Sequence, residues 1–76
     1  MKLSDLKKDD RAIIKKINAD KALKQRLSSF GVGKGAELSV ETYSIGKKTY
    51  EIIVNDTMIA LRDEEAKKIE VEKIHE

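Results

Sequence analysis

The alternation of apolar and polar residues along the chain predicts five short β-strands. Successive side chains of a strand point to opposite faces of a sheet, so an apolar residue at every second position marks a strand with one buried face. The pattern predicts strands at residues 11–17, 36–42, 50–54, 57–62 and 69–73. Five short strands joined by tight turns favour a mainly β fold, a small closed barrel, because closure removes sheet edges that would otherwise be exposed.

Most of the predicted strands have one apolar face. The first strand departs from this rule because Ile13 and Ile14 are adjacent, so that either both of its faces are covered or a bulge lies there. Before this strand, Leu3 and Leu6 have the spacing of one helical turn, or of a lip that covers an edge of the core. The residues predicted to share the inward faces of the next three strands are Ala36, Leu38, Val40, Thr42, Tyr50, Ile52, Val54, Ile59 and Leu61.

A single amphipathic helix is predicted between the first and second strands. Either Asn18 or Asp20 can cap its first turn by accepting backbone N–H groups. Gly31 suits the left-handed position that ends many helices, and Val32 would then pack back against Leu27. The residues that recur at three- and four-residue intervals, and therefore share one face of this helix, are Ala19, Ala22, Leu23, Leu27 and Phe30.

Polar segments predict the turns between these elements. Residues 7–10 are expected to form a polar turn and residues 44–48 a loop. Asn55 and Asp56 stand between two apolar runs, as a two-residue hairpin requires, although the glycine typical of such turns is missing. Asp63 is expected to cap a one-turn helix at residues 64–67, whose acidic residues complement the positive end of the helix.

The composition limits the chain to one small domain, residues 1–76. No linker, repeat or low-complexity segment divides these 76 residues, which contain no proline and four glycines. No apolar run approaches the ~20 residues that span a bilayer, and the first residues lack the apolar core of a signal peptide. The absence of cysteine excludes disulfides and thiolate metal sites. We therefore expect a soluble cytoplasmic protein.

Few side chains point to catalysis or to a metal. The only histidine is His75, beside the C-terminus, and a single imidazole does not make a metal site. Hard cations such as ferrous iron accept carboxylate ligands, and the densest acidic clusters are Asp9-Asp10 and residues 63–65. A turn and a helix cap explain both clusters, so we predict no metal site and no cofactor. Without cysteine or an internal histidine to activate a nucleophile, the chain is not expected to be an enzyme.

Charge is distributed unevenly along the chain, whose net charge is +2. Residues 1–38 carry ten basic and five acidic residues, whereas residues 39–76 carry six and nine. A basic stripe on a small barrel can bind nucleic acid when aromatic residues accompany it, but Phe30 and Tyr50 fit core positions instead. Interleaved acidic residues and the low net charge also argue against a nucleic-acid partner. The candidate stripe consists of Lys7, Lys8, Arg11, Lys15 and Lys16.

Four segments of the chain form a combined pattern. They are Leu3-x-x-Leu6, Ala12-Ile-Ile-x-x-Ile17, Arg26-Leu27-x-x-Phe30-Gly31-Val32-x-x-Gly35 and Ile59-Ala60-Leu61-Arg62-x-x-Glu65-Ala66-x-x-Ile69-x-Val71. Together these segments closely resemble the FeoA family, the ferrous iron transport protein A domains, from about residue 2 to residue 72. The chain departs from the family at turns, where the family often has glycine in place of Asp9 and Asp56, and proline in place of Lys34.

The resemblance implies an SH3-like β-barrel of about five strands, with an α-helix inserted after the first strand and a one-turn helix before the last. It also implies an accessory role in ferrous iron uptake beside FeoB, the membrane GTPase that transports the ion, so that the membrane is involved only through this transporter. The family is not established as enzymatic. Two alternatives stay open: a nucleic-acid-binding barrel, and a carrier that holds ferrous iron with carboxylates.

A small barrel without catalytic residues is expected to act by surface contact. The inserted helix is the feature added to a minimal barrel, so contact with a partner is expected there, and an uncovered helix face would also allow weak pairing of two copies. If Leu23 and Leu27 face the core, the residues between them face solvent. Arginine is common at interface hot spots, although a surface ion pair would also explain this one. The predicted partner-binding residues are Lys24, Gln25 and Arg26.

Overall fold

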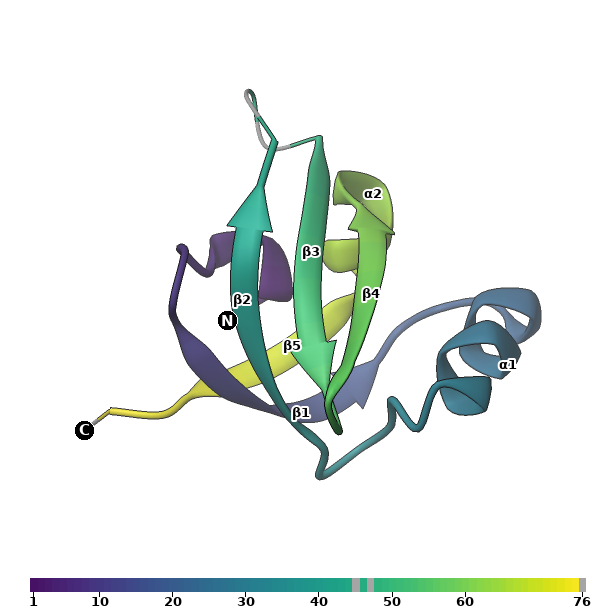
Figure 1. Ribbon diagram of the computed structural model, residues 1–76. Coiled ribbons are helices and arrows are strands. Elements are labelled where there is room, and N and C mark those ends of the chain that lie inside the picture. Colours follow the sequence, from purple (N-terminus) through teal and green to yellow (C-terminus); the bar gives the residue numbers. More distant parts are fainter. Residues whose placement is uncertain (45, 47, 76) are drawn as a thin grey trace.

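The computed structural model describes residues 1–44, 46 and 48–75 and shows one curved sheet accompanied by short helices (Figure 1). Its strands are β1 (Arg11–Ile17), β2 (Glu37–Tyr43), β3 (Thr49–Val54), β4 (Thr57–Arg62) and β5 (Ile69–Lys73). The helical elements are the 3-10 turn η1 (Leu3–Asp5), α1 (Lys21–Ser29) and the one-turn helix α2 (Asp63–Ala66). The predicted plan is confirmed: five strands, a helix after the first strand and a one-turn helix before the last.

Neighbouring strands all pair antiparallel, in the order β4-β3-β2-β1-β5. Figure 1 shows how this sheet forms a barrel, because β1 and β5 cross behind the layer made by β2, β3 and β4. The two end strands, β4 and β5, are consecutive along the chain and are connected through α2. Within the described residues no ladder of hydrogen bonds joins β4 to β5. The N-terminal segment pairs with β5 instead, through a bridge between Lys2 and Glu70 and a bond of 2.8 Å from Val71 N–H to Met1 O.

The core confirms most of the predicted inward positions. Leu3 and Leu6 are fully buried, so the N-terminal turn η1 covers an edge of the core. The ring of Tyr50 is also buried, and its hydroxyl donates a hydrogen bond to the carbonyl oxygen of Ser4 at 3.1 Å. The Asp63 carboxylate is a second partner of this hydroxyl, with Oδ1 at 3.4 Å, so burial leaves the polar atom satisfied. The other predicted inward positions that are buried are Leu38, Val40, Ile52, Val54, Ile59 and Leu61.

Two register shifts explain where the strands depart from simple alternation. The pairing of β2 with β3 shifts between Val40 and Thr42. One extra residue in a strand moves the following side chains to the opposite face, so Thr42 is exposed and Tyr43 packs against the core instead. The prediction that Thr42 faces inward is therefore wrong. The pairing of β1 with β5 shifts just after Ile14, which agrees with the bulge expected beside the two adjacent isoleucines.

Phe30 is not a core residue, contrary to the prediction, because 44% of its surface is exposed. Helix α1 ends at Ser29, and Phe30 is the cap residue, with φ −96° and ψ 5°. Its side chain therefore leaves the helix face that Leu23 and Leu27 bury. Val32, which is 2% exposed, occupies the buried position after the helix instead. Ala22 is also exposed, so the buried face of α1 is narrower than predicted.

The tight turns adopt left-handed backbone conformations without glycine. Asn55 and Asp56 have φ values of 52° and 64°, as a two-residue type I′ hairpin between β3 and β4 requires. The predicted hairpin is therefore confirmed. Asp9, in the polar turn before β1, has φ 70°. Asparagine and aspartate tolerate this region better than other residues with a side chain. Asp9 and Asp56 thus hold conformations in which glycine is the usual residue.

The last helix begins one residue earlier than predicted. Asp63 is the first residue of α2, and Arg62 occupies the cap position, so the prediction that Asp63 is the cap is wrong. The backbone N–H of Arg62 donates to Glu65 Oε1 at 2.9 Å, which is the reverse bond of a capping box.

In the predicted loop at residues 44–48, Ile45 and Lys47 lie outside the described residues, and Thr49 N–H donates to Ser44 Oγ at 3.0 Å.

Candidate protein-binding site

Both ends of helix α1 are satisfied by local hydrogen bonds. At the N-terminus, Asp20 is the cap, and its Oδ1 accepts the backbone N–H of Leu23 at 2.9 Å. The alternative cap, Asn18, instead donates its side-chain amide to Glu70 at 2.7 Å. The cap, together with the burial of Leu23 and Leu27 against the barrel, fixes the direction of the helix.

The C-terminus of α1 is a Schellman motif, as predicted. Gly31 N–H donates to Ser28 O at 2.9 Å, and Val32 N–H donates to Leu27 O at 2.9 Å. These are the two bonds that define the motif, and Gly31 supplies the left-handed residue, with φ 78°. The chain therefore turns sharply away from the helix axis, and Val32 returns to the core.

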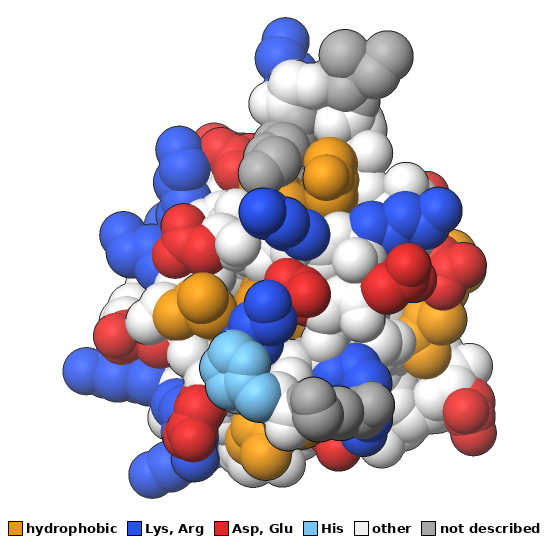
Figure 2. All heavy atoms as spheres, turned by 90° about the vertical axis from the view of Figure 1, so that its left-hand side faces the viewer, with side chains coloured by type: hydrophobic (Ala, Val, Ile, Leu, Met, Phe, Trp, Pro, Cys, Tyr) orange, Lys and Arg blue, Asp and Glu red, His pale blue; other side chains and the backbone are white. Residues whose placement is uncertain are grey.

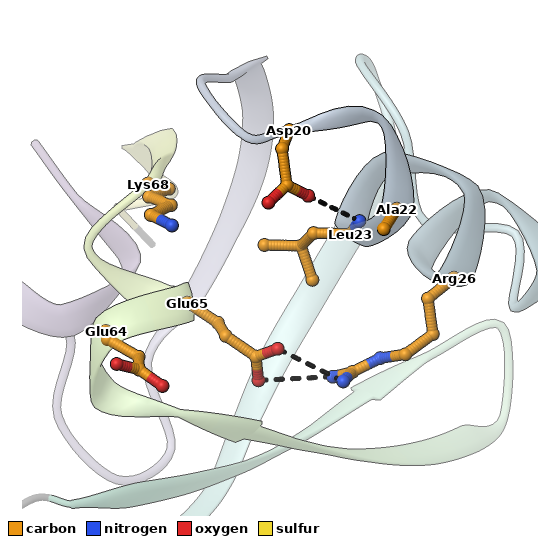
Figure 3. A pocket seen from close by; sticks show the side chains of 7 residues that line it. All are labelled: Asp20, Ala22, Leu23, Arg26, Glu64, Glu65 and Lys68. Carbon is orange, nitrogen blue, oxygen red and sulfur yellow. Dashed lines mark hydrogen bonds and ion pairs between the residues drawn. The ribbon is translucent and has the colours of Figure 1, made fainter.

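The helix places the three predicted partner-binding residues on two different sides. Arg26 reaches across to α2, where its guanidinium lies 3.1 Å from Glu65 Oε2 and donates to Glu65 Oε1 at 3.2 Å (Figure 3). Glu65 is well covered, with 15% of its side chain exposed, whereas Arg26 is 46% exposed. The ion pair that was the alternative explanation for Arg26 is therefore present, and it ties α1 to α2.

An open cleft of about 330 Å³ lies between α1 and α2. Figure 3 shows Arg26 and Glu65 meeting across it, with the side chain of Leu23 pointing into the space between the two helices. Carboxylates and cations both line this cleft, so it has no strong preference for ligands of one charge. Its lining residues are Asp20, Ala22, Leu23, Arg26, Glu64, Glu65 and Lys68.

Lys24 and Gln25 lie away from this cleft. Both are exposed, and they line a separate shallow hollow of about 470 Å³ with Ala19, Lys21 and Ser28. Neither Lys24 nor Lys21 makes an ion pair with any residue that the structure describes. Two of the three predicted contact residues thus have side chains free to meet a partner.

The acidic clusters considered as metal ligands take part in local contacts. Asp10 Oδ2 accepts the Lys7 backbone N–H at 2.8 Å, and this bond, together with the nearby Lys73 ammonium at 3.3 Å, holds the pKa of the Asp10 carboxyl below its ordinary value. In the second cluster, Asp63 pairs with Lys67 at 3.0 Å. Among the described residues, no three histidine, cysteine or acidic side chains gather where they could hold a metal ion.

The basic stripe considered for nucleic acid is interrupted by carboxylates. Arg11 pairs with Glu37 at 2.7 Å, and Lys15 pairs with Glu72 at 3.2 Å. Figure 2 shows acidic and basic side chains interspersed over one whole face of the molecule, with no continuous basic band. Tyr50, which could otherwise have stacked on a base, is buried. This face therefore lacks the uniform field that phosphate binding uses.

None of the described helices is long and apolar enough to cross a lipid bilayer.

Tyr50, like Asp10, has a shifted pKa. Burial raises the pKa of its phenol above the ordinary value, and the neighbouring Asp63 carboxylate adds to this effect. Because the ring is in the core, this shift reflects packing and not a reactive site.

Comparison with known proteins gives consistent matches. The model of the FeoA domain family matches residues 1–73. A protein of Campylobacter jejuni named as an Fe(2+) transport protein A is 40% identical over 74 residues, which cover 97% of this chain and all of that protein. The solution structure of a FeoA protein from Chlorobium tepidum superposes with a TM-score of 0.89 at 35% identity, covering 93% of this chain and 68% of the other.

The FeoA of Stenotrophomonas maltophilia, solved in complex with zinc, superposes with a TM-score of 0.81 at 30% identity. The match covers 95% of this chain and 89% of that protein, which is described as a prokaryotic SH3 domain protein. The SH3-like description of the barrel is therefore confirmed. With the five-stranded barrel, the inserted helix and a family match over nearly the whole sequence, the chain belongs to the FeoA domain family.

Proposed function

We propose that this protein is an accessory factor of ferrous iron uptake that acts by binding the cytosolic region of a FeoB-type membrane GTPase transporter. The observation that carries the proposal is the match to a relative named for Fe(2+) transport along that relative's whole length. The Stenotrophomonas maltophilia protein, described as a candidate activating factor of bacterial ferrous iron transport, supports the same role. The protein works in the cytoplasm, without catalysis and without a cofactor.

The surface of α1 supports a role in contact rather than in iron carriage. Lys24 and Gln25 are exposed on the helix that the fold adds between β1 and β2. The carboxylates of Asp10 and Asp63, in contrast, are engaged by lysines within the domain. A protein that bound ferrous iron through these groups would have to break those pairs first. Contact through Lys24 and Gln25 needs no such rearrangement.

The test is an NMR titration of isotope-labelled protein with the cytosolic region of the cognate transporter. The proposal expects localised amide shifts at residues 20–35. Absence of shifts at high micromolar concentrations of the transporter region would overturn it. Parallel titrations with ferrous iron under anaerobic conditions and with short oligonucleotides examine the two alternatives, and saturable shifts in either one with none from the transporter would favour that alternative.

Variants of α1 separate contact residues from structural ones. Lys24→Glu with Gln25→Glu should weaken binding while leaving the fold intact, because both side chains are exposed. Arg26→Glu should also weaken binding, but it breaks the ion pair with Glu65 as well. Glu65→Gln is the matched control, because it frees the guanidinium without removing it. If Arg26 contacts the transporter, Glu65→Gln preserves or increases the affinity; if Arg26 only holds α1 in place, Glu65→Gln weakens binding as Arg26→Glu does.

A further inference from the structure

Two adjoining hollows form one basic groove along α1. The first hollow, described above, shares Lys24 and Ser28 with a second hollow of about 500 Å³ that extends to β1 and to the segment after α1. We call the joined hollows the basic groove. Its charged lining residues are Lys15, Lys16, Lys21, Lys24 and Lys34, and no carboxylate lines either part.

Most of these lysines make no ion pair with the residues that the structure describes. Lys15 pairs with Glu72 at 3.2 Å. The other four make no ion pair with the described residues. Five cations therefore lie around one concave surface in a protein whose net charge is only +2. Such a surface raises the local concentration of anionic groups and orients an anionic partner as it approaches.

The floor of the groove is apolar. Ile17 and Ala19 are partly buried residues that pack against the core, and Val32 is buried beneath the second hollow. A ligand that fills the groove thus meets methyl groups at its base and ammonium groups at its rim. That combination fits a segment that carries carboxylates together with an aliphatic side chain.

The same lining disfavours nucleic acid. None of the three aromatic residues of the chain lines the groove, so it offers no ring on which a base could stack. The groove also lacks arginine, whose planar fork binds phosphate in a bidentate manner. Lysine ammonium groups bind carboxylates as point charges, which suits flexible acidic side chains.

We infer that the basic groove binds an acidic peptide segment of a protein partner, anchored by an aliphatic side chain on Ile17, Ala19 and Val32. The groove proposal does not require that this partner be the transporter, so the experiment below can succeed where the transporter titration fails, and the reverse. Lys24 belongs both to the groove and to the predicted contact surface of α1. The lysines of the groove favour an acidic segment, and the apolar floor of the groove favours a segment that contains an aliphatic residue.

The probe is a fluorescent synthetic peptide of about ten residues that alternates pairs of glutamate with leucine. About ten extended residues span at most ~36 Å, enough to cross a domain whose longest dimension is 29 Å. Two control peptides replace leucine by serine, or glutamate by glutamine. Fluorescence anisotropy at low salt is expected to show saturable binding of the first peptide, and at least ~5-fold weaker binding of both controls. Raising the salt from ~0.05 to ~0.3 M should weaken binding several-fold.

Two charge-reversal variants of equal net charge locate the binding site. The groove variant combines Lys16→Glu, Lys24→Glu and Lys34→Glu. The control variant reverses three exposed lysines outside the groove, and consists of Lys8→Glu, Lys48→Glu and Lys68→Glu. The groove variant should lose at least ~10-fold in affinity relative to the control variant. A neutral form, with glutamine at Lys16, Lys24 and Lys34, repeats the test if the reversal unfolds the domain, as monitored by circular dichroism.

Several results would overturn the inference. Equal losses in the two charge-matched variants would assign binding to the overall charge and not to the groove. Tighter binding of a single-stranded oligonucleotide, or of vesicles containing anionic phosphatidylserine, would assign the groove to those ligands. Absence of peptide binding up to ~1 mM would show that the groove does not bind an acidic segment.

Discussion

Arg26 and Glu65, which are 39 positions apart in the sequence, join helices α1 and α2. The guanidinium of Arg26 meets both carboxylate oxygens of Glu65, and the same carboxylate accepts the backbone N–H of Arg62. One side chain therefore organises the first turn of α2 and holds α1 beside it. The ion pair by itself explains why an arginine stands at position 26, and no partner protein is needed for that explanation.

We expect a measurable but small coupling between these two side chains. A double-mutant cycle with Arg26→Ala and Glu65→Ala should give about 0.5–1 kcal/mol, since Arg26 is half exposed and exposed pairs contribute little. Glu65→Ala alone should destabilise more than Arg26→Ala, because it also removes the acceptor for Arg62 N–H. Urea unfolding at low and high salt measures both effects. Additive single changes would show that the pair contributes nothing to stability.

Gly31→Ala should destabilise the protein by about 1 kcal/mol or more. Gly31 has φ 78°, and an added Cβ would lie 3.0 Å from the side-chain nitrogen of Asn55. The amide of Asn55 is exposed and can move, so the backbone strain is the larger part of the cost. Gly33→Ala is the matched control, because nothing lies within 4 Å of its added Cβ. Thermal unfolding of both variants should show a clear loss for Gly31→Ala and little change for Gly33→Ala, and equal effects would contradict this account.

At position 56, in the hairpin between β3 and β4, the stability of the protein should increase with the residue's tolerance of positive φ. Asp56 has φ 64°, so Asp56→Ala should cost about 1 kcal/mol, and Asp56→Gly should be neutral or stabilising by up to ~1 kcal/mol. Side-chain contacts do not decide this order, since Asp56 is exposed. Urea midpoints of the three proteins provide the measurement. An alanine variant as stable as the wild type would show that the turn is not strained.

Stability should fall at acidic pH in part through Asp10. The Lys7 N–H bond and the Lys73 ammonium lower the pKa of this carboxyl in the folded protein. The unfolded chain therefore takes up the proton first, so the stabilisation is present above about pH 4 and is lost as the pH falls through the lowered pKa. Asp10→Asn should reduce the slope of the urea midpoint against pH below pH 4. Lys73→Gln should reduce it only in part, because the Lys7 bond remains; an unchanged slope in Asp10→Asn would refute the assignment.

The local patterns were sufficient to predict the elements of the fold. Alternating residues such as Tyr50, Ile52 and Val54 identified strands because each faces the same core, and Gly31 identified the end of α1 because its φ requirement is local. Thr42 and Phe30 were mispredicted for a shared reason. The orientation of Thr42 depends on a bulge in β2, and that of Phe30 depends on the residue at which α1 ends. Neither feature can be recognised from the order of apolar and polar residues.

The candidate site was only partly predictable. Lys24 and Gln25 followed from the helical period, which places them away from Leu23 and Leu27. The sequence could not show that Arg26 faces Glu65, because that contact depends on how α1 packs beside α2. The basic groove was also missed, since Lys16, Lys24 and Lys34 come from three separate segments. The only feature that these lysines share in the sequence is their positive charge, and charge alone does not show that they lie close together in the fold.

Helix α1 is attached to the barrel by side-chain contacts. In the part of the chain that the structure describes, the backbone hydrogen bonds of residues 19–32 stay within that segment, from the Asp20 cap to the Schellman bonds. The buried side chains of Leu23, Leu27 and Val32 and the ion pair of Arg26 connect it to the rest of the domain. The segment can therefore open as a unit while every strand ladder stays paired, at the cost of exposing these three apolar side chains to water.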